Sequence, residues 1–262
     1  MERLERPGLD NGSSACMTGF RPWDRVSAAG GVYLHTAGEQ DPAFLGSCSA
    51  LGRATHFVTA AHCVRNLSVD ELRISHWGQR QGEPFSRVTA CEIDVGADLA
   101  VLQTEVANPQ SIQPFQALSA GVAFGEPVSS IGWPVGILAE YREAALRVMR
   151  GYVQRQFFYR GLLGGTYQAL ELHFASPPGL SGAPVFLDAH PFILLGVMTE
   201  NFQSLTRIDS VEEEKAPGEF RRIETHEMVT YGVAVNPFHA IRFLEDVIGL
   251  GSLNALDRPT AP

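Results

Sequence analysis

The stretch PGLSGAP, residues 178–184, places Ser181 between two glycines in a turn-forming segment. Gly179 and Gly182 carry no Cβ, which permits a tight backbone conformation that aims the N–H groups of Gly179 and Ser181 at one point. Two such donors can form an oxyanion hole, and Ser181 is then a candidate nucleophile beside them. Because a serine between glycines also occurs in ordinary turns, the assignment depends on a base and a carboxylate elsewhere in the chain.

Two further segments supply those groups. TAAHC contains His62, and DLAVL begins with Asp98. Acyl transfer by serine needs a base that takes the hydroxyl proton and a carboxylate that fixes the imidazole tautomer and stabilises its charged form. We therefore assign Ser181 as the nucleophile, His62 as the base and Asp98 as the carboxylate. Asp94 is a rival for the last role, but we expect it in the preceding loop, whereas Asp98 leads into an apolar strand.

Short apolar runs broken by Gly, Pro and polar turns fill the chain from Gly31 onward. Many short strands at this spacing are typical of a β-sandwich or β-barrel and not of βαβ units. The strand-like runs are 32–34, 57–59, 72–74, 100–102, 128–131, 170–174, 184–186, 193–198 and 231–235.

One helix is expected near the C-terminus, over residues 237–248. Asn236 is a good N-cap, Pro237 suits the first helical position, and Gly249 can end the helix. Apolar residues recur between these limits at helical spacing, at Phe238, Ile241, Leu244, Val247 and Ile248.

The composition is that of a globular protein, with 45% hydrophobic and 19% charged residues in a chain of 262. A net charge of -9 makes nucleic acid and anionic membranes poor partners. Neither a CxxC pair nor an HExxH motif occurs, so we expect no metal and no cofactor. No stretch approaches the roughly 20 apolar residues of a membrane span, and the first residues lack the apolar run of a signal peptide. We therefore interpret the protein as cytoplasmic.

The three motifs together resemble those of the chymotrypsin/trypsin-like serine protease family. The order His62, Asp98, Ser181 is the order of that family and differs from the order in subtilisins and α/β-hydrolases. The resemblance runs from about residue 31 to residue 250, and the stretch 125–134 is similar to the opening of the second barrel in bacterial members.

This resemblance implies an all-β fold of two six-stranded antiparallel β-barrels with a C-terminal helix. The expected units are an N-terminal extension at 1–25, a first barrel at 26–115 with His62 and Asp98, a second barrel at 116–250 with Ser181 and the helix 237–248, and a flexible tail at 251–262.

The resemblance also implies a serine endopeptidase that acts on a protein or peptide substrate through an acyl-enzyme. We interpret it as an intracellular regulatory protease of narrow substrate range, and an activating partner protein would fit this role. The alternative is a catalytically silent trypsin-fold module that binds peptides. An esterase is a third reading, but the resemblance favours peptide bonds.

In the trypsin-like family the floor of the specificity pocket lies six residues before the nucleophile. That position is Ala175, which carries no charge, so the pocket is expected to prefer an apolar P1 residue such as Leu, Met or Phe over a basic one. Glu200 could reverse this preference if its carboxylate turned inward. The hydroxyl of Thr199 is expected to bond the triad carboxylate, as its family counterpart does. The expected substrate-binding residues are Ala175, Ser176, Met198, Thr199, Glu200, Asn201 and Gly232.

The sequence departs from the family at three places. Leu180 stands where zymogen-activated members have an Asp, so we expect no activation by insertion of a new N-terminus. Cys48 and Cys63 occupy positions where the family often has a disulfide, and we expect free thiols in a reducing cytoplasm. The long stretch 201–229 is interpreted as a solvated surface loop, with a lid or exosite as the alternative.

Overall fold

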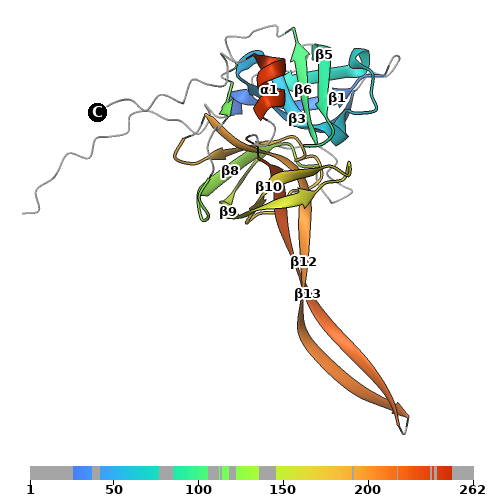
Figure 1. The fold of residues 1–262 in the computed structure, drawn as a ribbon. Coiled ribbons are helices and arrows are strands. Elements are labelled where there is room, and N and C mark those ends of the chain that lie inside the picture. Colours follow the sequence, from blue (N-terminus) through green and yellow to red (C-terminus); the bar gives the residue numbers. More distant parts are fainter. Residues whose placement is uncertain are drawn as a thin grey trace, which may run out of the picture.

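A computed structural model describes residues 26–36, 42–76, 85–105, 112, 114–117, 122–135, 146–190, 192–216, 218–236, 238 and 241–249. The expected N-terminal extension and C-terminal tail lie outside the described residues. The described part is almost entirely β-strand, with two barrels side by side and one hairpin that projects far beyond them (Figure 1). No described helix is long and apolar enough to span a membrane.

The first half is a closed antiparallel barrel of six strands in the order β1-β2-β3-β6-β5-β4. Buried and more exposed side chains alternate along β4, as expected of a strand with one face on a core. The strands are β1 (Ala29–Leu34), β2 (Ala43–Leu51), β3 (Arg53–Ala60), β4 (Leu72–His76), β5 (Ser86–Asp94) and β6 (Leu99–Thr104), and two short 3₁₀ helices, η2 (Ala61–Cys63) and η3 (Val69–Glu71), follow β3.

The second half is a seven-stranded sheet in the order β11-β8-β9-β10-β13-β12-β7. A further pairing of β11 with β12 closes six of these strands into a ring, and the two-residue β7 is added in parallel at one side of β12. The predicted all-β fold is thus confirmed, with β7 as the extra strand. The strands are β7 (Gln116–Ala117), β8 (Pro127–Gly132), β9 (Arg147–Arg160), β10 (Thr166–Leu172), β11 (Pro184–Leu187), β12 (Ile193–Ala216) and β13 (Glu219–Val235).

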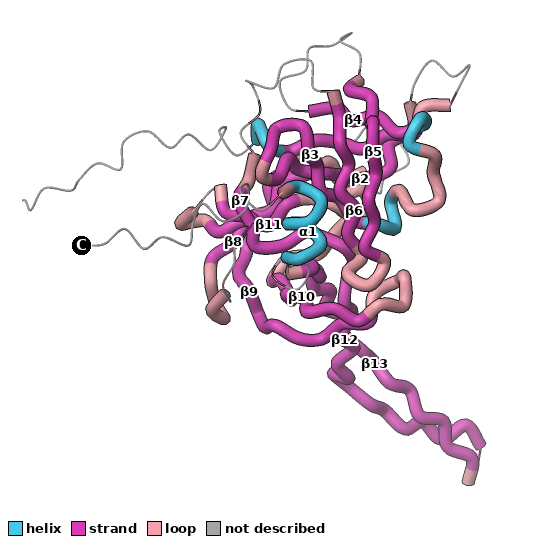
Figure 2. The backbone as a smooth tube through the Cα atoms, turned by 45° about the horizontal axis from the view of Figure 1, so that its top comes forward, coloured by secondary structure: helices cyan, strands magenta, loops and turns pink. Residues whose placement is uncertain are grey.

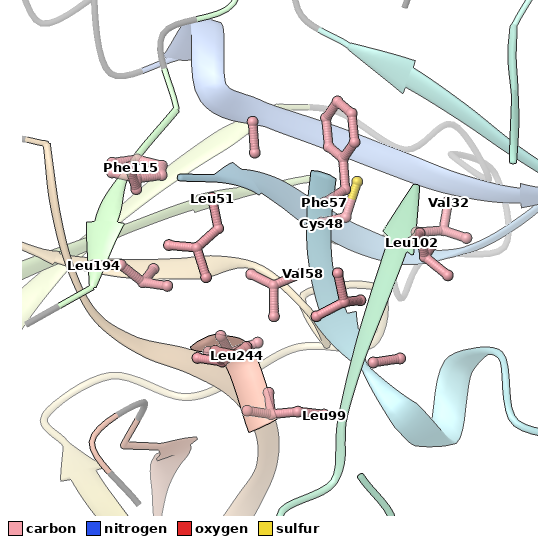
Figure 3. Packing of buried hydrophobic residues seen from close by; sticks show 14 of the residues in the cluster. Val32, Cys48, Leu51, Phe57, Val58, Leu99, Leu102, Phe115, Leu194 and Leu244 are labelled. Atoms are coloured by element: carbon pink, nitrogen blue, oxygen red, sulfur yellow. The ribbon is translucent and has the colours of Figure 1, made fainter. Parts of the chain in front are cut away.

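One hydrophobic cluster fills the first barrel and continues into the second, so the two halves share a core. The C-terminal helix α1 (Ile241–Ile248) buries Leu244 and Ile248 in this cluster and packs on the first barrel, near Leu99 (Figure 3). The Phe238 N–H donates to the Asn236 side-chain oxygen at 2.9 Å. The described helix nevertheless begins at Ile241, and Phe238 is 47% exposed.

The stretch that the sequence analysis interpreted as a loop is a regular hairpin. β12 and β13 pair with each other from Val197/Val235 to Ala216/Glu219. We call the part between Gln203 and Thr230 the arm. It leaves the second barrel as a twisted two-stranded ribbon (Figures 1 and 2). The loop interpretation was wrong because two strands can satisfy each other's backbone without a core beneath them.

Candidate active site

His62 and Asp98 are brought together by the pairing of two strands of the first barrel. β3 runs antiparallel to β6, with Ala60 opposite Leu99. His62 follows β3 in the short helix η2, and Asp98 ends the turn that precedes β6. The backbone N–H of Ala61 also donates to the Asp98 carbonyl at 3.0 Å, which fixes the two segments against each other.

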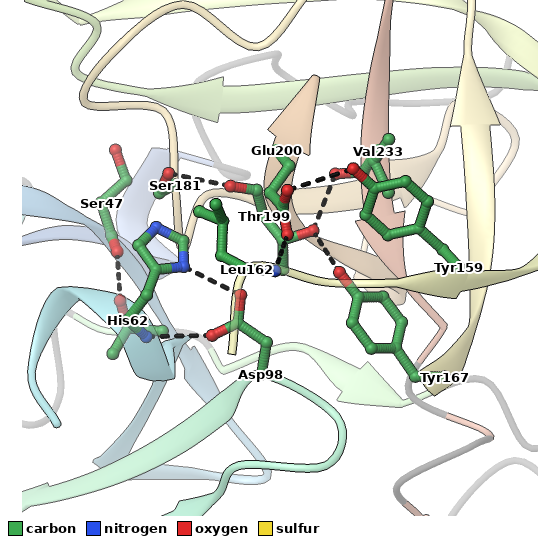
Figure 4. A network of polar contacts seen from close by, with 11 residues as sticks. Ser47, His62, Asp98, Tyr159, Leu162, Tyr167, Ser181, Thr199, Glu200 and Val233 are labelled. Carbon is green, nitrogen blue, oxygen red and sulfur yellow. Dashed lines mark hydrogen bonds and ion pairs between the residues drawn. The ribbon is translucent and has the colours of Figure 1, made fainter. Parts of the chain in front are cut away.

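The Asp98 carboxylate bonds His62 at two points, one on the ring and one on the backbone (Figure 4). Its Oδ2 lies 2.8 Å from His62 Nδ1, and its Oδ1 accepts the backbone N–H of His62 at 2.9 Å. The Asp98 residue is fully buried and has a φ of 53°, in the left-handed region that non-glycine residues rarely adopt. Asp94 instead caps its own turn, because its Oδ1 accepts the N–H of Ala97 at 3.0 Å. The structure therefore places Asp98, and not Asp94, beside the base.

The surroundings of His62 favour its charged form. Burial lowers the pKa of His62, but the hydrogen bond and charge of Asp98, together with the neighbouring Cys63, outweigh burial and raise this pKa above its usual value. The protonated form of His62, which arises when it takes a proton from a nucleophile, is therefore stabilised.

Ser181 lies in a loop whose shape depends on the two predicted glycines. Gly179 and Gly182 have φ values of 89° and 86°, which side chains with a Cβ seldom adopt. A Cβ at Gly182 would also overlap the carbonyl oxygen of Ser47. Both glycines are thus required for the conformation that carries the serine.

The backbone of this loop leaves two donors available. The N–H groups of Leu180, Gly182 and Ala183 donate to the carbonyls of Pro177, Met198 and Leu180 respectively. Within the described residues, no such loop bond uses the N–H of Gly179 or Ser181. These are the two groups that the sequence predicted as the oxyanion hole.

Ser47 is a residue that the sequence analysis missed. Its hydroxyl donates to the Gly179 carbonyl at 2.8 Å and accepts the N–H of Trp133 at 3.0 Å. Its backbone N–H donates to the Ser181 carbonyl at 2.8 Å. The hydroxyl of Thr59 in turn donates to the Ser47 carbonyl at 2.7 Å. Ser47 thereby ties β2 of the first barrel to the nucleophile loop, and nothing in the sequence around it signals this role.

Leu180 orders the same loop by burial. Its side chain is 0% exposed and belongs to the hydrophobic cluster of the second barrel. An apolar side chain anchored in the core therefore stands where zymogen-activated members of the chymotrypsin/trypsin-like family place an ion pair.

The Ser181 hydroxyl donates to the carbonyl of Thr199 at 3.1 Å, and in Figure 4 no bond joins Ser181 to His62. The Thr199 hydroxyl does not take the role expected for it. It donates to the Val233 carbonyl at 3.2 Å and lies 3.1 Å from the hydroxyl of Tyr167. Because its only proton goes to Val233, the predicted bond from Thr199 to the Asp98 carboxylate is not formed.

The predicted specificity pocket is bridged by one side chain. The Asn201 amide accepts the Ser176 N–H at 2.5 Å and donates to the Ser176 carbonyl at 2.6 Å. Met198 is fully buried in the core of the second barrel, and a Cβ at Gly232 would meet its Cε. Ala175, the expected floor, is partly exposed and brings no charge. The Asn201 amide therefore reduces the space between β12 and the segment before the nucleophile.

Glu200 is directed to other partners. Its carboxylate accepts the Tyr159 hydroxyl at 3.1 Å and the backbone N–H of Leu162 at 2.7 Å. Burial and the nearby Glu200 raise the pKa of Tyr159 to about 12, so the phenol stays a donor. Glu200 is thus held by β9 and the turn after it, and it does not supply the negative charge that Ala175 lacks.

The described cysteines, Cys48, Cys63 and Cys91, are free thiols, as expected for the first two. Burial raises the pKa of Cys48 well above its usual value, which keeps this thiol protonated. Cys63 instead packs against Gly46, where a Cβ would come within 2.9 Å of the Cys63 sulfur. Among the described residues, no group of three or more His, Cys, Asp or Glu side chains could hold a metal ion.

Comparison with known proteins gives one family. The family model of the trypsin-like peptidase domain matches residues 46–193, more than half of the chain. No curated protein matches the sequence.

Several solved proteases share the fold. The active form of the Rv3671c protease from M. tuberculosis has a TM-score of 0.57 at 14% identity, over 90% of this chain and 85% of that chain. The MamO protease domain from Magnetospirillum magneticum has a TM-score of 0.57 at 16% identity, over 84% of this chain and 97% of that chain. The HtrA-type protease AlgW with tripeptide has a TM-score of 0.57 at 20% identity, over 88% of this chain but only 63% of that chain. The chain thus spans less than two thirds of the length of AlgW. At sequence identities of 14–20%, the similarity to these three proteases shows a shared fold.

Proposed function

Because the chain belongs to the trypsin-like peptidase domain family, we propose that it is a serine endopeptidase that cleaves peptide bonds through an acyl-enzyme. The observation that carries this proposal is the contact between His62 and a fully buried Asp98, beside a serine loop with two available N–H donors. His62 takes the proton of Ser181 as its oxygen attacks the substrate carbonyl, and Asp98 stabilises the imidazolium. The N–H groups of Gly179 and Ser181 receive the oxyanion.

The remaining steps reuse the same groups. His62 returns its proton to the leaving amine, which departs and leaves an ester on Ser181. Water then attacks this ester, again with His62 as the base, the acyl group leaves as a carboxylic acid, and His62 returns the proton to the Ser181 oxygen. Before the first attack the Ser181 hydroxyl must leave the Thr199 carbonyl. A substrate N–H that bonds this carbonyl would displace the hydroxyl, so substrate binding would favour the reactive rotamer.

An apolar P1 residue fits the pocket best. Ala175 gives the floor no charge, and Glu200 is engaged with Tyr159 and Leu162. A Lys or Arg side chain would therefore lose its hydration without a partner. The bridge from Asn201 to Ser176 further restricts the pocket, which supports a narrow substrate range and a regulatory role.

We place the enzyme inside the cell, with a protein or peptide as its substrate. The free thiols of Cys48 and Cys63 support a reducing compartment. The loop of Ser181 is ordered by Leu180 and Ser47 without a new N-terminus, so any switch of activity would come from a partner protein.

A silent peptide-binding module is the second candidate. The observation in its favour is that the Ser181 hydroxyl bonds Thr199 and not His62. Incubation of a proteome-derived peptide library with wild type, Ser181→Ala and His62→Ala separates the two functions. An endopeptidase produces new internal termini with wild type alone. A library that wild type binds but leaves intact would assign the silent module.

A further inference from the structure

The outer edge of β12 is unusual for its length. On one side β13 accompanies β12 from Val197 to Ala216. On the other side β11 pairs with it only over residues 194–197. From Thr199 outward, therefore, no strand within the described residues covers this second edge. A long free edge presents unpaired N–H and C=O groups that another extended chain can bond.

The backbone bonds show which groups face this edge. Gly232 lies opposite Asn201, and the Gly232 N–H donates to the Phe174 carbonyl at 2.6 Å, away from β12. The pair Asn201/Gly232 is thus a non-hydrogen-bonded pair, so the N–H and C=O of Asn201 point to the outer edge. By alternation, the same holds for the next odd residues, Gln203, Leu205 and Arg207, up to the register shift after Arg207.

This edge begins at the candidate nucleophile. The Thr199 carbonyl accepts the Ser181 hydroxyl at 3.1 Å, and the outward-facing groups of Asn201 come next along the strand. A chain that reaches Ser181 along β12 would therefore find donors and acceptors without interruption from the active site into the arm.

We propose that the outer edge of the arm binds the part of the substrate that precedes the scissile bond, as an added antiparallel strand. β12 runs away from Ser181, so an antiparallel partner runs toward it and delivers its C-terminal end to the nucleophile. Pairing from Thr199 to Arg207 would engage about eight substrate residues. The inference rests on the proposed function and names the class of substrate: an extended segment, not a short loop.

Side chains on the arm support an extended partner. Leu205 and Met228 face each other across the two strands and are 67% and 58% exposed. A substrate residue opposite Leu205 would cover part of this pair, so an apolar side chain is favoured there. Arg207, two residues further on, is already paired with Glu224 at 3.2 Å.

Substrate extension tests the proposal. A peptide core cleaved by the enzyme is lengthened by eight alternating Thr and Val residues, at its N-terminal or at its C-terminal end. The N-terminal extension should raise kcat/KM about tenfold or more, because each added hydrogen bond contributes a few-fold, and the C-terminal extension should leave it unchanged. Equal effects of the two extensions would overturn the proposal.

Two proline variants locate the effect on one edge. Leu205→Pro removes a donor from the outer edge of β12, and Met228→Pro, at the directly opposite residue, removes one from the outer edge of β13. Leu205→Pro should abolish the gain from the N-terminal extension, while Met228→Pro should retain it. The gain is measured in each variant relative to that variant's own cleavage of the short core. A third variant joins Ser204 to Val229, which are cross-strand partners, through an Asn-Gly turn and should also lose the gain.

Binding to Ser181→Ala protein separates this inference from the proposed function. Fluorescence anisotropy should show tighter binding of the N-terminally extended peptide than of the core, whether or not wild type cleaves either. Equal binding would overturn the arm proposal while cleavage of the core still supports the protease. A wild-type dimer that Leu205→Pro converts to monomer would also overturn it, since a second copy would then occupy the edge.

Discussion

The two oxygens of Asp98 bond two different atoms of His62, Oδ2 the ring Nδ1 at 2.8 Å and Oδ1 the backbone N–H at 2.9 Å. One carboxylate therefore fixes both the orientation of the ring and the chain segment that carries it. This requires Asp98 to adopt a left-handed φ of 53°, a conformation that costs on the order of 1 kcal/mol or more for a non-glycine residue. The surrounding turn and β6 maintain it.

Asp98→Asn should lower kcat about 10⁴-fold, because an amide would stabilise the wrong imidazole tautomer. Asp94→Asn is the matched control and should change kcat little, since the Asp94 carboxylate accepts the Ala97 N–H in its own turn. Steady-state kinetics on one peptide decide the matter. A larger loss in Asp94→Asn than in Asp98→Asn would show that the carboxylate is wrongly assigned.

The pH dependence follows from the raised pKa of His62. The base acts only when neutral, so activity should fall as the pH drops through this raised pKa, and the acid limb of kcat/KM should lie above pH 6.5, the usual midpoint for His. In Ser181→Ala protein, NMR titration of His62 should give a midpoint above the usual value. Adding Asp98→Asn should lower it, because the partner that raises the pKa is lost. An unchanged midpoint would contradict this cause.

Ser47→Ala removes the bonds to the Gly179 carbonyl and from the Trp133 N–H. We expect kcat to fall about tenfold or more, because the oxyanion donors lose part of their support, while KM changes little. A circular dichroism melt checks that the fold persists, and Ser68→Ala, at the exposed N-cap residue of η3, is the control. A rise in KM at constant kcat would instead assign Ser47 to substrate binding.

Asn201→Gly should widen the specificity pocket, because the amide that bridges to Ser176 is removed. A peptide library varied at P1 should shift toward larger apolar residues such as Phe. Glu200→Gln, at the neighbouring residue, should leave the P1 preference unchanged because Glu200 bonds Tyr159 and Leu162. A strong preference for Arg or Lys that disappears in Glu200→Gln would overturn the apolar pocket.

The sequence predicted those residues of the site that lie in short local motifs. His62, Asp98 and Ser181 each lie in a short motif. Gly179 and Gly182 have positive φ values, a conformation that glycine itself indicates in a sequence. The all-β fold, which was predicted from the short apolar runs and from the family resemblance, is confirmed.

The features that sequence reasoning missed depend on contacts between distant segments. Ser47 reaches Gly179 across 132 positions in the chain, and a strand serine gives no hint of this. Thr199 has Tyr167 and Val233 as partners, which no local pattern indicates. The arm is polar and highly charged, so it lacks the apolar alternation by which a strand with a buried face is recognised.

The central claim is that His62 and Asp98 activate Ser181 in the protein as it stands. A fluorophosphonate probe, followed by mass spectrometry of the labelled peptide, tests this most directly. The account predicts that the chain of residues 1–262 is modified at Ser181 without prior trimming, and that His62→Ala reduces the labelling rate by several orders of magnitude. Equal labelling of wild type and His62→Ala, modification of another serine, or an absolute need for cleavage before about residue 31 would contradict it.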